Sequence, residues 1–261
     1  MPGKTKLRFF LIVFKLLLFF WIDTRSILLA SSIDGSPLSI HENNFLLIGA
    51  EDSPYSKNIV FKFQLSAKLK ILESPFYFAY TQRSFMDVAS YSFPFYDHNY
   101  RPEFFYVQGI AGKKILKALQ LGVLHSSNGK GEDSSRGWNY VYLKLYFKSG
   151  RAYFEPKFIV ALLLDQDNNP DLRQYYGALK LNLGYRWPNN VEWSASVYPG
   201  IQFDKYSVET NFNIPWKVIF KKLDEKTITS LWFHAYHGFG ETLLGYNQIT
   251  QSISLGFGIR G

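Results

Sequence analysis

Cysteine is absent from this chain of 261 residues, so it has no disulfide framework, no thiolate metal site and no cysteine nucleophile. Beyond residue 32 it also lacks any apolar run that approaches the roughly 20 residues of a helical membrane span. No basic stripe is interleaved with aromatic residues, which argues against a nucleic-acid partner. A membrane protein with this sequence would therefore have to be a β-barrel, because only helices and closed barrels satisfy their own backbone hydrogen bonds in lipid.

The N-terminal segment has the pattern of an export signal. A basic stretch at residues 4–8 precedes an apolar run at 9–22, and small residues follow. Lys15 divides the run and leaves it short of a membrane span. We therefore expect a signal peptide over residues 1–32, cleaved near Ser32, with a membrane-anchoring helix as the alternative. This segment carries +4 of the formal net charge of +8, and the remaining excess suits anionic lipid headgroups as well as ordinary solubility.

Aromatic residues and period-two alternation dominate the rest of the chain. Phe, Tyr and Trp make up 18% of the sequence, as expected where rings form belts at membrane interfaces. One side of each alternating segment is apolar, and the other carries Lys, Arg, Asn, Gln and Ser. The segments fall near 44–50, 59–71, 76–83, 103–109, 115–125, 138–148, 151–163, 175–187, 190–199, 205–214, 227–237 and 249–259.

These segments number twelve, and an even strand count is typical of single-chain outer-membrane barrels. We therefore predict one all-β domain over residues 33–261, a transmembrane antiparallel β-barrel of about 12 strands, with its longer loops at 84–102 and 126–137. A secreted β-sandwich also alternates, but its apolar face would be a core. Segment length favours the barrel, because about 10 residues cross the hydrocarbon and usual strands have about 5 or 6.

A base, a hydroxyl and an amide lie on the apolar side of two consecutive predicted strands. His125 and Ser127 continue the alternation that ends at Val123, and Asn139 begins the alternation that continues at Val141. An amide facing hydrocarbon is costly without a partner, so the three groups together favour a catalytic site that faces lipid. The simpler interpretation makes His125 a loop residue and the residues after it a turn.

Several segments resemble one known family, outer-membrane phospholipase A, a twelve-stranded barrel esterase of the Gram-negative outer membrane. The likeness runs from about residue 40 to the C-terminus, and His125-Ser126-Ser127-Asn128-Gly129 and Ser135-Arg136-Gly137-Trp138-Asn139 match its active-site signature in spacing. Tyr80-Thr81-Gln82, Ser92-Phe93-Pro94-Phe95, Asn99-Tyr100-Arg101-Pro102-Glu103 and the segment 238–247 are similar to further family segments in the same order. The ending Gly258-Ile259-Arg260-Gly261 departs from the aromatic last residue usual in such barrels.

The resemblance implies a role for each matching residue. Ser127 is expected to be the nucleophile, His125 its base, and Asn139 the group that orients the imidazole. Gln82 is expected to steady Asn139, and a backbone N–H near Gly129 to stabilise the oxyanion.

The family also binds calcium at a dimer interface, and the matching positions are Ser92, Lys130 and Ser135. Hydroxyl and backbone carbonyl oxygens suit a hard cation. Lys130 replaces the usual arginine, which matters little if its main-chain carbonyl is the ligand. Glu132 and Asp133 lie nearby, but acidic residues in an exposed loop are more often solvated than bound to a metal.

The resemblance therefore implies a Ca²⁺-dependent outer-membrane enzyme, active as a homodimer, that hydrolyses the sn-1 and sn-2 acyl esters of phospholipids and lysophospholipids. The alternative from another class is an outer-membrane barrel without chemistry, a pore or binding protein whose inner face carries Lys62, Lys68, Lys70, Lys180 and Arg186. A soluble secreted sandwich, such as a lectin, is the third possibility.

Overall fold

The computed structural model describes residues 37–261 except 113–114, 165–168 and 223–227, so the predicted signal peptide lies outside the described residues. The strands are β1 (Leu38–Ser39), β2 (Asn44–Asp52), β3 (Ile59–Lys70), β4 (Phe76–Asp87), β5 (Phe95–Gly109), β6 (Leu116–Ser127), β7 (Gly137–Ser149), β8 (Ala152–Leu164), β9 (Leu179–Arg186), β10 (Glu192–Tyr198), β11 (Ser207–Pro215), β12 (Thr229–Phe239) and β13 (Ile249–Ile259).

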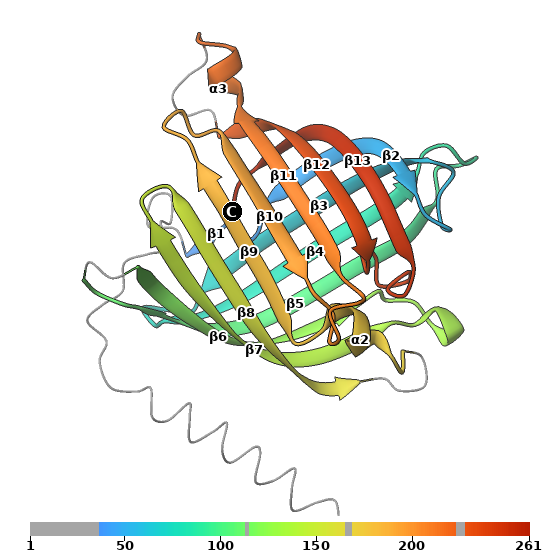
Figure 1. Ribbon diagram of the computed structural model, residues 1–261, viewed down its shortest axis with the longest axis horizontal. Coiled ribbons are helices and arrows are strands. Elements are labelled where there is room, and N and C mark those ends of the chain that lie inside the picture. The colour runs from blue at the N-terminus through green and yellow to red at the C-terminus, as the bar shows by residue number, and fades with distance from the viewer. Residues whose placement is uncertain (1–36, 113–114, 165–168, 223–227) are drawn as a thin grey trace, which may run out of the picture.

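The strands close into a barrel (Figure 1). From β2 to β13 each strand pairs antiparallel with the next in sequence, and β13 pairs with β2 to complete the ring. The two-residue β1 pairs with β3 beyond the point at which β2 stops pairing with it. β1 therefore continues β2 along the same edge of β3 and adds no further strand to the ring. The wall therefore has 12 strands, β2 to β13, as the alternation predicts.

The barrel exposes apolar side chains on its outer wall, whereas its interior buries many polar side chains together with a cluster of mainly aromatic residues. On β3 the inward-pointing Lys62 and Gln64 are each 2% exposed, whereas the outward-pointing Leu65 is 56% exposed. Ile253 on β13 is 73% exposed although it is aliphatic. A soluble sandwich would bury the apolar face and expose the charged one, so the sandwich alternative is wrong. A wall that exposes aliphatic side chains all along its strands is suited to lipid.

The two ends of the barrel differ (Figure 1). Antiparallel order places the β4–β5, β6–β7, β8–β9 and β12–β13 connections at one end, which we call the loop end. It carries the short helix α2 (Leu172–Tyr176) and the 3-10 turn η2 (Glu132–Ser134). The opposite end, called the C-terminal end, carries the tight β7–β8 turn, helix α3 (Trp216–Ile219) and Gly261. No helix among the described residues is long and apolar enough to span a membrane.

Two predicted boundaries at the loop end are wrong. β5 begins at Phe95, so most of the predicted loop at 84–102 belongs to β4 and β5. Residues 95–102 place buried Asp97 and Asn99 inward, and polar His98 lies between them, so hydropathy does not alternate there. The segment predicted as a strand from 175 begins only at Leu179, because α2 occupies its first residues.

Candidate active site

His125 and Asn139 face each other across two neighbouring strands. They are directly opposite in the pairing of β6 with β7, and His125 Nδ1 lies 2.8 Å from Asn139 Oδ1. An amide oxygen can only accept, so this bond requires Nδ1 to carry the proton and leaves the Nε2 lone pair free. The imidazole is therefore oriented and set to the tautomer in which Nε2 can act as a base.

Ser127 lies two residues beyond His125 on the same side of β6. The burial of β6 alternates, and His125 and Val123 are exposed on the outer side that Ser127 shares, whereas Ser126 is buried on the inner side. Ser127 is the last residue of the strand, opposite Gly137. Among the residues that the structure describes, no hydrogen bond joins Ser127 Oγ to His125. The arrangement places a hydroxyl and an imidazole side by side on the outer wall, and such contacts tighten when substrate binds.

Asn128 organises the loop that follows the serine, and sequence reasoning missed it. Its side chain is 2% exposed and donates from Nδ2 to the carbonyl of Ser134 at 2.9 Å. Its Oδ1 accepts from the backbone N–H groups of Arg136 at 2.9 Å and Lys130 at 3.3 Å. One buried amide thus satisfies three backbone groups of an irregular segment, which fixes the loop between Ser127 and β7. An Asn-Gly pair signals a turn, but it does not show that the amide faces inward.

Gly129 turns the chain away from the strand. Its φ of +67° lies in the left-handed region, and a Cβ at this position would meet the Tyr100 ring at 2.8 Å. Tyr100 stacks on His98 with ring centroids 5.6 Å apart and pairs with Ser127 across β5 and β6. The ring and the loop therefore fit only with a glycine. This exposed residue places a backbone N–H two residues after the serine.

Aromatic packing at the loop end supports the same loop from inside the barrel. Trp138 stacks on Tyr176 of α2 with centroids 5.6 Å apart, and the Arg136 guanidinium lies 5.7 Å from the Tyr246 ring centroid. Tyr246 donates to Asp171 at 2.5 Å, and burial and this carboxylate raise the pKa of Tyr246, which keeps the hydroxyl a donor. The β6–β7 loop is thus fixed to the two loops beside it.

Gln82 does not meet Asn139 in the described part of the chain. Its amide accepts from the Tyr80 hydroxyl at 3.1 Å and donates to Ser84 at 3.0 Å. Strands β5 and β6 separate β4 from β7 around the wall. The contact between Gln82 and Asn139 that the resemblance implies is therefore not made within one chain. Gln82 does lie on the outer side of the wall. Its role in the reaction stays a prediction.

The residues predicted to bind calcium lie on two loops at the loop end. Ser92 is exposed in the β4–β5 turn with φ of +66°, and Lys130 and Ser135 belong to the β6–β7 loop. The Lys130 ammonium donates to the Tyr96 carbonyl at 2.6 Å. The donor set of two hydroxyls and one carbonyl consists of hard oxygen ligands and fits Ca²⁺.

Known proteins match this chain in sequence. The sequence model of a family described as Phospholipase A1 matches residues 37–259. A putative phospholipase A1 of Neisseria meningitidis is 29% identical over 215 residues, which cover 75% of this chain and 53% of the relative. The phospholipase A1 of Escherichia coli K12 is 29% identical over 178 residues, which cover 65% of this chain and 56% of the relative. The chain spans about half the length of these relatives.

Solved structures share the fold. The outer membrane phospholipase A from Escherichia coli superposes with a TM-score of 0.77 at 23% identity, covering 85% of this chain and 98% of that one. The Salmonella typhi outer membrane phospholipase dimer with bound calcium gives a TM-score of 0.77 at 22% identity, covering 88% and 94%. At these identities the likeness establishes the barrel fold.

Proposed function

This chain belongs to the phospholipase A1 family, and we propose that it hydrolyses the acyl esters of phospholipids with Ser127, His125 and Asn139. The observation that carries the proposal is the outward-facing His125–Asn139 pair beside Ser127 on a wall of exposed apolar residues. Polar groups on such a wall are costly in lipid, so their presence there indicates a function. Their position favours a substrate that lies in the membrane beside the barrel.

The reaction proceeds by acyl transfer to serine. Ser127 Oγ attacks the ester carbonyl carbon while its proton passes to His125 Nε2, and Asn139 Oδ1 stabilises the imidazolium through Nδ1–H. Collapse of the tetrahedral intermediate breaks the ester C–O bond, and the leaving alcohol takes the proton from His125. Water then attacks the acyl-serine by the same route, which releases the fatty acid and restores the hydroxyl.

The Gly129 backbone N–H is proposed to donate to the oxyanion. It lies in an exposed segment whose conformation is fixed by Asn128 and by the left-handed φ of Gly129 itself. A fixed backbone donor costs no reorganisation as the charge develops. We assign the positive-φ glycine to this role because the donor must point outward, on the side that Ser127 occupies.

Substrate selectivity is proposed to be broad with respect to ester position. His125 is exposed and Ser127 is half-buried on a barrel wall, and one chain does not enclose them. A site without enclosing walls has few contacts with which to distinguish the sn-1 from the sn-2 ester, or a phospholipid from a lysophospholipid. We therefore propose that all of these are cleaved.

Calcium and a second copy are proposed to complete the site in the outer membrane. Lys130 and Ser135 of the β6–β7 loop, with Ser92 of the β4–β5 turn, would hold Ca²⁺ through their oxygens. Bound calcium would polarise the ester oxygen and offset negative charge that develops on it. A partner barrel against the outer wall would supply the acyl-chain groove that one chain lacks, which supports a homodimer as the active form.

Adjacent serines provide a matched test. Ser127→Ala removes the proposed nucleophile on the outer side, and Ser126→Ala removes a buried hydroxyl on the inner side of the same strand. With purified protein in detergent, calcium and a phospholipid substrate, we expect Ser127→Ala to lower the rate at least roughly 10³-fold and Ser126→Ala to keep it within a few-fold. Equal rates in the wild type and Ser127→Ala would exclude the proposed chemistry.

A further inference from the structure

Two lysines inside the barrel lie directly opposite each other on neighbouring strands. Lys157 of β8 pairs with Lys180 of β9, and on its other side Lys157 pairs with Lys144 of β7. Lys144 has a counter-charge, because its ammonium lies 2.7 Å from Glu155. Neither Lys157 nor Lys180 has a carboxylate within 4.0 Å in the described part of the chain. Like charges directly opposite in a sheet destabilise it, so the pair needs another explanation.

Both lysines line a cavity of about 620 Å³ inside the barrel. Ten lysine and arginine side chains line this cavity against five glutamates. Each glutamate is already engaged: Glu42 with Arg101, Glu103 with His41, Glu155 with Lys144, Glu192 with Arg186 and Glu209 with Arg83. The cavity therefore keeps an excess of positive charge that the protein does not neutralise, with Lys157 and Lys180 at its wall.

Aromatic rings hold the two ammonium groups in place without offsetting their charge. Lys157 Nζ lies 3.7 Å from the Tyr142 ring centroid and 5.3 Å from that of Tyr140. Lys180 Nζ lies 5.0 Å from the Tyr198 ring centroid. These cation–π contacts orient the groups, but the rings carry no net charge. The ammonium groups thus remain available to an anion that enters the cavity.

We propose that Lys157 and Lys180 form an anion-binding site for a water-soluble, phosphate-bearing molecule inside the barrel. Lysine binds phosphate as a compact point charge, and two lysines side by side match the multiple oxygens of one phosphate group. The volume lies within the range of small-molecule sites. The ionic lining of the cavity excludes acyl chains, so the ligand is a free phosphate compound or a deacylated headgroup, which share this chemistry.

The cavity is open at the C-terminal end and closed at the loop end. Its lining includes Gly150 in the β7–β8 turn and Gly261, both at the C-terminal end. Toward the loop end the interior is filled by the buried Lys62 and by Leu172 and Leu243, which are at most 2% exposed. An anion can therefore enter and be retained, whereas passage through the barrel is blocked. This favours binding over conduction.

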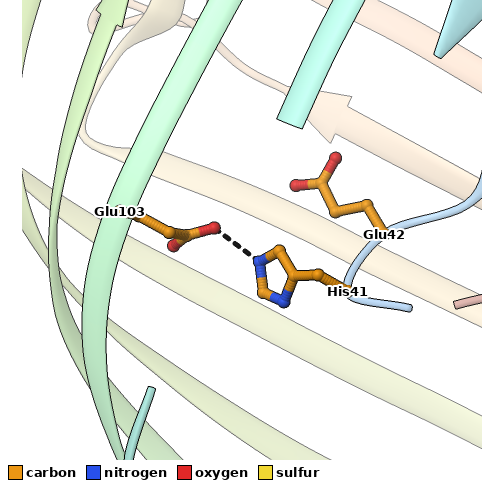
Figure 2. Close-up of side chains that lie close together, drawn as sticks. All are labelled: His41, Glu42 and Glu103. Carbon is orange, nitrogen blue, oxygen red and sulfur yellow. Dashed lines mark hydrogen bonds and ion pairs between the residues drawn. The ribbon is translucent and has the colours of Figure 1, made fainter. Parts of the chain in front are cut away.

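A metal ion is the competing occupant, at His41, Glu42 and Glu103, whose side chains lie close together (Figure 2). These three residues line the same cavity as the two lysines. Their ligand atoms lie within 4.8 Å of one another, and the imidazole points at Glu103, with Nε2 2.5 Å from Oε1. Glu42, however, is 2.9 Å from the Arg101 guanidinium. A cation would have to displace Arg101 and enter a cavity with positive excess, so the charges favour an anion.

Titration calorimetry of the purified protein in non-ionic detergent tests the site. The probes are inorganic phosphate, pyrophosphate and glycerophosphoethanolamine. The variants are Lys157→Gln/Lys180→Gln and the control Lys70→Gln, whose ammonium pairs with exposed Glu73 outside the cavity. We expect saturable binding to the wild type and Lys70→Gln, and at least about tenfold weaker binding to the double variant, since each lysine contributes a charge-assisted contact. Tighter binding of pyrophosphate would identify a free phosphate compound as the ligand, and tighter binding of glycerophosphoethanolamine would identify a deacylated headgroup.

Thermal unfolding separates a lost site from a misfolded variant. Removing the opposed charges should raise the midpoint of the ligand-free double variant, whereas a saturating phosphate probe should raise only the midpoints of the wild type and Lys70→Gln. Absence of saturable phosphate binding to the wild type, or equal binding to the double variant, would overturn the proposal. The proposal would also be overturned if the wild type bound Zn²⁺ but no phosphate and Glu103→Gln abolished the Zn²⁺ binding. These readouts do not depend on ester hydrolysis.

Discussion

At the scale of single residues, the outward-facing site depends on an amide where hydrolases of this type often place a carboxylate. Asn139 accepts from His125 Nδ1 and so fixes the ring and its tautomer, but it offers an imidazolium only a dipole. A carboxylate on this wall would bring a full charge to a surface of exposed aliphatic residues, at a high desolvation cost. The neutral amide orients the base at a smaller cost in lipid.

Replacement of Asn139 tests this positioning role. Asn139→Ala removes the acceptor, so the imidazole should lose its orientation and kcat should fall on the order of 10²-fold while KM changes little. Asn139→Asp keeps an oxygen opposite Nδ1 and should retain more activity than Asn139→Ala. Steady-state kinetics on one lysophospholipid in detergent micelles measures both. A kcat for Asn139→Ala equal to that of the wild type would show that Asn139 does not act through His125.

At the scale of elements, the β6–β7 loop depends on one inward-facing side chain. Asn128 satisfies three backbone groups across the loop, and Gly129 supplies the left-handed turn against Tyr100. The loop therefore holds its shape without regular secondary structure apart from the short turn η2. The proposed oxyanion donor and two of the proposed calcium ligands lie in this loop.

Asn128→Ala should loosen the loop while the barrel remains folded. Three backbone groups lose their partner, and the local cost should be about 1–3 kcal/mol for the buried groups left unsatisfied. We expect a large fall in ester hydrolysis and faster proteolytic cleavage within residues 129–136. Glu132→Ala, an exposed change in the same loop, is the control. Unchanged proteolysis of Asn128→Ala would show that other contacts fix the loop.

All twelve wall strands were predictable from the sequence, but some of their boundaries were not. The pattern around Leu65 and Ile253 located β3 and β13, because lipid contact demands apolar side chains at every second position. The start of β5 escaped prediction because its outer side is polar at His98. Alternation placed His125 and Asn139 on the same outer side, and the family resemblance implied their contact. The inward direction of Asn128 depends on loop contacts, which hydrophobic periodicity does not indicate.

At the scale of the whole molecule, the barrel has a polar interior held by ion pairs. Lys62 is 2% exposed and lies 2.5 Å from Glu241 in the β12–β13 loop and 3.1 Å from Glu51 on β2. Its ammonium also donates to Ser252 of β13 at 2.7 Å, so Lys62 joins the loop end to both sides of the seam at which β13 meets β2. Interior ion pairs thus add to the packing of the buried aromatic residues in holding the barrel.

Lys62→Ala should destabilise the barrel strongly. It leaves two buried carboxylates without their cation, and loss of one partner of a buried ion pair costs about 3–5 kcal/mol. Lys70→Ala breaks a pair with the fully exposed Glu73 and should leave stability unchanged. Urea unfolding in detergent or lipid vesicles, followed by tryptophan fluorescence, compares the two variants. Equal midpoints for both would mean that the interior ion pairs do not hold the seam.

Calcium dependence belongs to the same scale, because the proposed ligands lie on two loops and activity is proposed to need two copies. Chelation should lower both the rate of ester hydrolysis and the fraction of dimer seen by sedimentation, and added Ca²⁺ should restore both.

Ser135→Ala removes one proposed ligand, so half-maximal activity should require at least about tenfold more free calcium, as expected for the loss of one good oxygen ligand. Ser134→Ala changes an exposed serine next to it and should leave the calcium requirement alone. Identical calcium titrations of these two variants would mean that Ser135 is not a calcium ligand and that the cation binds elsewhere. A rate of hydrolysis that chelation does not change would mean that the reaction does not need calcium, and it would leave the proposed serine chemistry intact.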